Sequence, residues 1–155
     1  MTSNTESQPQ DARIPIIFGV TGHRDIHPED KLPIQEALKQ RLNELLQQYP
    51  HSPFLLVSGL AEGSDRLVVE VALELGYGLV AALPMSQSEY EKDFDTTESV
   101  EHFRKLLSLA TVCYVVKSTN GTETYDQSKR TTSRDEAYLA LGRYIAKTAQ
   151  IVIAL

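Results

Sequence analysis

The residues best suited to chemistry in this sequence lie in one glycine- and serine-rich turn, residues 58–65. An apolar run precedes this turn and an amphipathic helical pattern follows it, so the turn leaves a strand and enters a helix. Glycines expose backbone N–H groups and serines supply hydroxyls, and a helix N-terminus with such groups can bind a phosphate without a cation. We therefore predict that an anionic ligand is bound by Ser58, Gly59, Ala61, Glu62, Gly63, Ser64 and Asp65.

A second candidate loop follows the first apolar run of the chain and contains Thr21, Gly22, His23 and Arg24. Gly22 could let a ligand approach the backbone, or it could be a plain turn glycine. Arg24 could pair bidentately with a phosphate or carboxylate, although a loop histidine and arginine can equally be solvated. Because carboxyl ends of parallel strands share one sheet edge, we expect this loop to lie beside the 58–65 turn.

Two acidic residues of the turn have alternative explanations. Asp65 could contact the ligand, cap its helix or pair with the adjacent Arg66. Glu62 could accept hydrogen bonds from ribose hydroxyls or remain solvated.

Three further candidate ligand-binding residues, Pro84, Tyr90 and Arg134, follow later strands. Tyr90 comes just after Pro84, where its ring could stack on a nucleoside base or form half-buried helix surface. Arg134 opens the last helical segment and could close over an anion or face the solvent. The carboxylate pairs Asp93/Asp95 and Glu89/Glu91 are expected on a solvated face.

The turn Ser-Gly-Leu-Ala-Glu-Gly-Ser-Asp at 58–65 resembles the S-G-L-A-x-G-x-D signature of the SMF/DprA-LOG (SLOG) superfamily. The segment Gly-Val-Thr-Gly-His-Arg at 19–24 matches the glycine-bearing first loop of the same group. The superfamily consists of Rossmann-like domains and includes DNA-processing protein A, lonely-guy phosphoribohydrolases and nucleotide-ligand sensors. The resemblance implies a Rossmann-like fold with a nucleotide at these loops, and it places Asp65 in the ligand-loop signature. Lonely-guy enzymes also carry a catalytic Pro-Gly-Gly-x-Gly-Thr-x-x-Glu loop, which nothing in this chain matches.

Apolar runs alternate with helical patterns along the chain, which predicts a three-layer α/β/α domain over 14–155 with a five-stranded parallel sheet. We expect the Rossmann-type strand order 3-2-1-4-5. The first helix is placed at about 32–49, because Pro33 should lie in the first turn. Capping boxes at 86–89 and 133–136 predict two further helix starts. A polar tail, 1–13, is expected to be disordered, and 118–132 to form a long loop.

Bulk composition narrows the possible partners. The 155 residues carry a formal net charge of −6, which makes nucleic acid an unlikely main partner because phosphate-backbone binding needs clustered Lys and Arg. No apolar segment is long enough to span a bilayer and the N-terminus lacks a secretory signal, so we expect a cytoplasmic protein without membrane contact. The single cysteine, Cys113, lies in an apolar run and is expected in the core.

These observations favour a sensor or regulatory domain that binds a nucleotide or nucleotide-derived ligand. A nucleotide N-glycosidase is the alternative, and a DprA-like DNA-processing module is the third possibility. No cofactor and no metal site are predicted, because zinc-ligand spacings and the Walker motif are absent. Because the fifth apolar run ends the sequence, we expect a truncated piece of a longer protein or a homo-oligomer whose other subunit completes the site.

Overall fold

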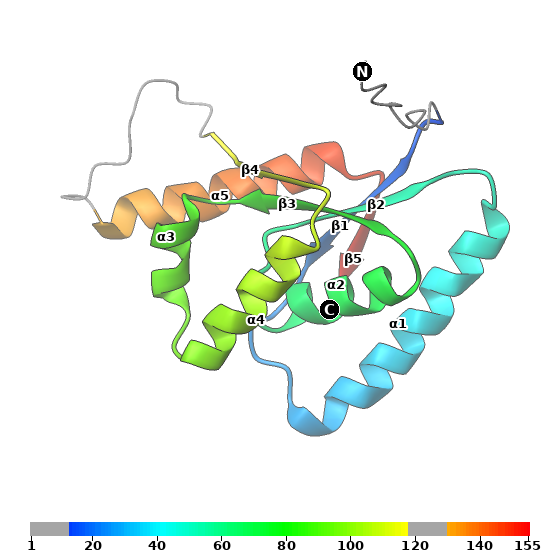
Figure 1. Ribbon diagram of the computed structural model, residues 1–155, viewed down its shortest axis with the longest axis horizontal. Helices are drawn as coiled ribbons and strands as arrows, with labels where there is room; N and C mark the ends of the chain where they lie inside the picture. The colour runs from blue at the N-terminus through cyan, green and yellow to red at the C-terminus, as the bar shows by residue number, and fades with distance from the viewer. Residues whose placement is uncertain (1–12, 118–129) are drawn as a thin grey trace, which may run out of the picture.

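The computed structural model describes residues 13–117 and 130–155, with no description of the side chains of residues 130–133. Five parallel strands form one sheet in the order β4-β3-β2-β1-β5 (Figure 1). The strands are β1 (Ile16–Thr21), β2 (Phe54–Ser58), β3 (Gly78–Leu83), β4 (Val112–Val115) and β5 (Ile151–Ala154). The helices are α1 (Pro28–Gln48), α2 (Ser64–Glu74), α3 (Gln87–Tyr90), the 3-10 turn η1 (Glu91–Asp93), α4 (Thr97–Ser108) and α5 (Arg130–Thr148). The predicted α/β class and the parallel five-stranded sheet are confirmed.

The sheet buries apolar side chains on both faces, as the unbroken apolar runs of the sequence require. On one face, α1, α2 and α4 cover a large core that includes Phe18, Leu56 and Leu79. On the other face, α5 packs Leu141 and Ile145 against Val57 and Ala82 (Figure 1).

The predicted strand order 3-2-1-4-5 is wrong, because the fourth strand pairs with the third and not with the first. The connection from β3 to β4 through α4 is short, and it crosses the same sheet face as α1 and α2. A right-handed crossover on that face places β4 beside β3, on the side away from β1. The return to β1 is made instead by α5, whose 19 residues span about 28 Å at roughly 1.5 Å per residue. The distance across the sheet from β4 to β5 is four strand spacings, or about 19 Å at roughly 4.8 Å each, so α5 is long enough to cover it. The chain therefore reverses direction across the sheet between β1 and β5.

Several local predictions also need correction. Helix α1 begins at Pro28, so Pro33 lies in its interior and not in its first turn. Helix α5 begins at Arg130, which places the predicted capping-box residue Ser133 inside the helix. Cys113 is exposed, because β4 is an edge strand whose residues are only partly covered.

Some predictions fall on parts of the chain without a description. The disordered tail, 1–13, lies outside the described residues except for Arg13, which donates a hydrogen bond to the carbonyl oxygen of His51 at 3.2 Å. Most of the predicted long loop, residues 118–129, likewise lies outside the described residues.

Candidate functional site

The loops after β1 and β2 meet at the carboxyl edge of the sheet, as predicted. The backbone N–H and the hydroxyl of Ser64 both donate to the carbonyl oxygen of His23, at 3.0 and 2.9 Å. The end of β5 joins the same edge, because the N–H of Leu155 donates to the Thr21 carbonyl at 3.1 Å and the N–H of His23 donates to the Leu155 carbonyl at 3.4 Å. Three loop or strand ends therefore converge beside the point where the chain direction reverses, which is where open α/β sheets bind ligands.

The 58–65 turn is held together by its own polar groups. The hydroxyl of Ser58 donates to Oδ2 of Asp65 at 3.1 Å and accepts from the N–H of Leu60 at 3.0 Å. Leu60 has a φ of 57°, in the left-handed region that costs a residue with a side chain about 1–2 kcal/mol. The Ser58 hydrogen bond and the full burial of the Leu60 side chain offset that cost.

Asp65 anchors this turn. Its carboxylate accepts hydrogen bonds from Ser58 and from the backbone N–H groups of Ala61 and Gly59. Desolvation raises the pKa of Asp65 to about 6, although these hydrogen bonds and the charge of Arg24 act in the opposite direction. Neither alternative considered from the sequence, a helix cap or a pair with Arg66, describes these contacts.

The prediction that the turn offers bare phosphate-binding groups is not supported by its geometry. Ser58 and Ser64 are only 0% and 1% exposed, and both hydroxyls already have protein partners. Gly63 has a φ of 79°, and a Cβ there would lie 2.0 Å from the carbonyl oxygen of Arg24. A Cβ on Gly22 would lie 2.6 Å from both the Leu155 carbonyl oxygen and Ser64. These glycines are therefore needed for loop-to-loop packing.

Arg66 is a structural residue that the sequence analysis missed as a part of the site. It is 4% exposed, its Nε donates to the Leu60 carbonyl at 3.0 Å, and its Nη1 donates to the Ser99 carbonyl and hydroxyl at 2.9 Å. Its guanidinium lies over the ring of Phe94, 4.5 Å from the centroid. The Ser99 hydroxyl in turn donates to the carboxylate of Glu62, so the turn is fastened to α4. The position of Arg66 directly after Asp65, the last residue of the signature, could have indicated that it belongs to the site.

The exposed cation at the edge is Arg24. Its guanidinium lies 5.3 Å from the ring centroid of Tyr138 on α5, and among the described residues it makes no ion pair. Thr21, Gly22 and His23 are exposed beside it. Tyr138 was not predicted as a site residue, because no sequence pattern indicates which loop residue will pack on a helix ring.

Arg134 also lies at this edge, but it is already neutralised. Its Nη1 contacts Oδ1 and Oδ2 of Asp93 at 2.6 and 2.7 Å, and its Nη2 lies 3.3 Å from Oε2 of Glu89. Asp93 also accepts a hydrogen bond from the Tyr138 hydroxyl at 2.5 Å. The predicted solvated position of Asp93 is wrong, since its side chain is 20% exposed and fully engaged. The anion-binding role considered for Arg134 therefore competes with two carboxylates.

Tyr90 is fully buried, with Phe94 and Phe103 around its ring at centroid distances of 5.0 and 5.5 Å. The ring has no exposed face for a base, so the predicted stacking role is wrong for this conformation. Its hydroxyl has no hydrogen-bond partner among the described residues, and burial raises its pKa. Pro84 is buried as well, at the end of β3.

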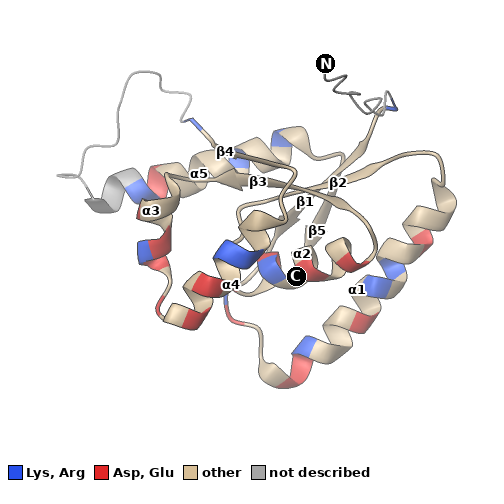
Figure 2. Cartoon of the chain, viewed as in Figure 1, with Lys and Arg blue, Asp and Glu red and all other residues tan. Residues whose placement is uncertain are grey.

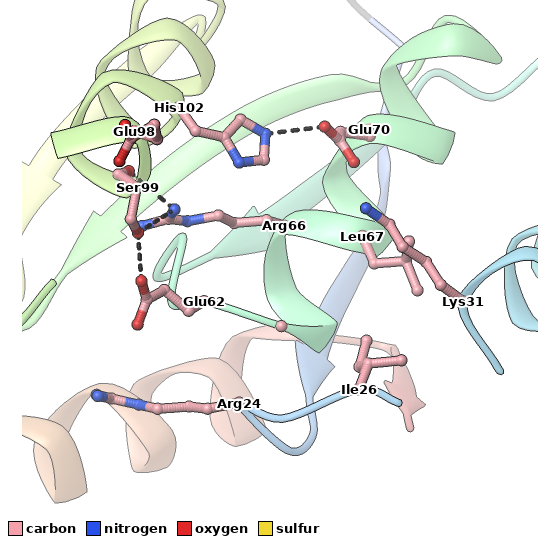
Figure 3. Close-up of a pocket in the computed structure, with 11 residues that line it drawn as sticks. Arg24, Ile26, Lys31, Glu62, Arg66, Leu67, Glu70, Glu98, Ser99 and His102 are labelled. Atoms are coloured by element: carbon pink, nitrogen blue, oxygen red, sulfur yellow. Dashed lines mark hydrogen bonds and ion pairs between the residues drawn. The ribbon is translucent and has the colours of Figure 1, made fainter. Parts of the chain in front are cut away.

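A pocket of about 350 Å³ adjoins the Glu62–Gly63 segment, and Arg24 is one of the residues that line it. Carboxylates of Glu62, Glu70 and Glu98 face it together with Lys31, and His102 is bonded to Glu70 at 2.8 Å (Figure 3). The Arg24 side chain points away from these groups and toward α5 (Figure 3). Because the carboxylates of Glu70 and Glu98 line the part of this pocket between α2 and α4, its end at Arg24 suits an anionic ligand better.

Two other features bear on the kind of site. Within 13–117 and 130–155, no cluster of three or more His, Cys, Asp or Glu side chains could hold a metal ion. In the same described part of the chain, no helix is both long and apolar enough to cross a bilayer.

Comparison with known proteins gives one structural likeness. No family model matches the chain, and no curated protein matches it. The chain is similar to the crystal structure of DNA processing protein A (DprA) from Streptococcus pneumoniae, with 16% sequence identity and a TM-score of 0.49. The match covers 90% of this chain and 41% of that chain, so this chain spans less than half of that structure's length. A likeness of this degree carries no argument about function.

Proposed function

We propose that this protein binds a nucleotide or nucleotide-derived ligand at the carboxyl edge of its sheet, as a sensor or regulatory domain of the SLOG type. The observation that carries the proposal is Arg24, an exposed guanidinium without an ion pair among the described residues. It lies where the loops after β1 and β2 and the end of β5 converge. A guanidinium in this position can bind a phosphate through two parallel hydrogen bonds.

The rest of the edge supports the proposal by being rigid. A hydrogen bond from Ser58 to Asp65 holds the 58–65 turn together. Two others fix the turn to α4 and to the loop that carries Arg24. A preformed site loses little conformational entropy when it binds its ligand. The main chain and the exposed Thr21 hydroxyl at this edge can then contact sugar hydroxyls.

Replacing Arg24 tests this function. We expect Arg24→Gln to weaken binding of nucleoside 5′-monophosphates by about tenfold or more, because a charge-assisted hydrogen bond contributes roughly 1.5–3 kcal/mol. Arg41→Gln is the matched control, since Arg41 is exposed on α1 and bonded to Glu44 at 2.8 Å. Isothermal titration with the 5′-monophosphates of adenosine, guanosine, cytidine and uridine measures the dissociation constant of the wild type and of each variant. Equal affinities of Arg24→Gln and the wild type would refute the assignment.

The N-glycosidase alternative has one observation in its favour, the raised pKa of Asp65, because a carboxyl group that titrates near 6 can act as a general acid or base. Against it, the Asp65 carboxylate is already occupied by Ser58 and two backbone N–H groups. We expect no release of free base from nucleoside monophosphates by chromatography. Base release that Asp65→Asn abolishes, and Asp95→Asn does not, would establish the enzyme instead.

A DNA-processing role is disfavoured by charge. The net charge is −6, and Figure 2 shows acidic and basic residues interspersed along α1 and α4. Binding to a phosphate backbone draws its affinity from clustered Lys and Arg.

A further inference from the structure

At the carboxyl edge, Asp93 contacts two residues of α5 that lie close to Arg24. Its carboxylate binds Nη1 of Arg134 at 2.6 and 2.7 Å and accepts from the Tyr138 hydroxyl at 2.5 Å. The ring of that same tyrosine lies under Arg24. Asp93 therefore holds the guanidinium of Arg134 in place, and it also fixes the Tyr138 ring against which Arg24 packs.

The charges at this edge balance almost completely. Arg134 is shared between Asp93 and Glu89, and Glu89 is also bonded to Lys92 at 2.5 Å. The side chains of Arg134 and Asp93 are only 19% and 20% exposed, so solvent screens them weakly. Among the described residues of the edge, Arg24 is the cation that makes no ion pair, although its charge also acts on Asp65 and Asp93.

We propose that Asp93 is a specificity-determining residue, which keeps Arg134 in an internal ion pair and so restricts the edge to ligands with a single anionic group, bound by Arg24. This inference rests on the proposed function and names the ligand class of the same site. A second or third phosphate would find no cation free of an ion pair among the described residues of this edge, so it would gain no charge-assisted hydrogen bond.

The experiment compares a nucleoside monophosphate with the triphosphate of the same base, by isothermal titration at pH 7.5 with a chelator present. In the wild type, the triphosphate should bind no more than threefold tighter than the monophosphate. In Asp93→Asn, Arg134 loses the closer of its two carboxylate partners and keeps only the 3.3 Å contact to Glu89, while the amide oxygen still accepts from Tyr138. Triphosphate affinity should therefore rise about tenfold, and monophosphate affinity should change less than threefold. Asp95→Asn is the matched control, because Asp95 is an exposed neighbour with the same charge.

A double variant, Asp93→Asn with Arg134→Gln, should lose the gain in triphosphate affinity, and circular dichroism confirms that each variant is folded. A tenfold preference of the wild type for the triphosphate would overturn the inference. So would an equal gain in Asp95→Asn, or a gain that persists in the double variant. Failure of the wild type to bind either nucleotide would instead refute the proposed function on which the inference rests.

Discussion

Gly63→Ala should destabilise the protein by about 2–5 kcal/mol, because two costs add at this position. The backbone has a φ of 79°, which costs a residue with a Cβ about 1–2 kcal/mol. The added Cβ would also lie 2.0 Å from the Arg24 carbonyl oxygen, and relieving that overlap requires backbone movement that costs roughly 1–3 kcal/mol. Urea denaturation followed by circular dichroism measures the loss.

Gly76→Ala is the matched control for this prediction. Gly76 has a φ of 84°, but a Cβ there would meet no atom within 4 Å. Its variant should therefore lose only the backbone cost, about 1–2 kcal/mol. Equal losses in the two variants would show that the loops after β1 and β2 are not packed as described. The same geometry means that Gly63→Val would damage the fold, so it cannot serve as a selective test of ligand binding.

The free energy of unfolding should depend on pH through Asp65, with a sign opposite to that of most carboxylates. Its pKa is raised to about 6 in the folded protein, chiefly by desolvation, against about 3.9 for an ordinary aspartate. The folded state therefore binds the proton more tightly than the unfolded state. The contribution to stability is fully present below about pH 4 and is lost as the pH rises to about 6, for a total of about 3 kcal/mol.

Asp65→Asn removes this titration and retains an oxygen that can accept from Ser58. We expect the difference in unfolding free energy, wild type minus variant, to be most favourable to the wild type at pH 4 and to fall by up to about 3 kcal/mol by pH 7. Asp95→Asn, at an exposed position, is the control for the loss of one carboxylate. A constant difference across this range, or one that grows with pH, would contradict the environment described for Asp65.

The sequence predicted the strands, the 58–65 turn and its proximity to the loop of Arg24, because apolar runs and glycine turns are local patterns. It did not predict that β4 pairs with β3, since strand order depends on which sheet face each crossover helix covers. The roles of Tyr138 and Arg66 were also missed. Each acts through a partner more than 30 positions away, Arg24 or Ser99, and no pattern of spacing encodes such contacts. The glycines at 22 and 63 were predicted as ligand contacts, and their close packing against neighbouring atoms gives a second reason for glycine at both positions.

The central claim is that the ligand lies over the carboxyl edge beside Arg24. Amide chemical-shift mapping by ¹H–¹⁵N NMR, during titration with each of the four nucleoside 5′-monophosphates, tests it most directly. We predict that the largest shifts occur at residues 21–24, at 59–62 and around Tyr138, and that the amides of Ser99 and His102 change little. Shifts centred on Ser99, His102 and Glu70, at the end of the pocket between α2 and α4, would contradict the claim, as would the absence of shifts with all four nucleotides.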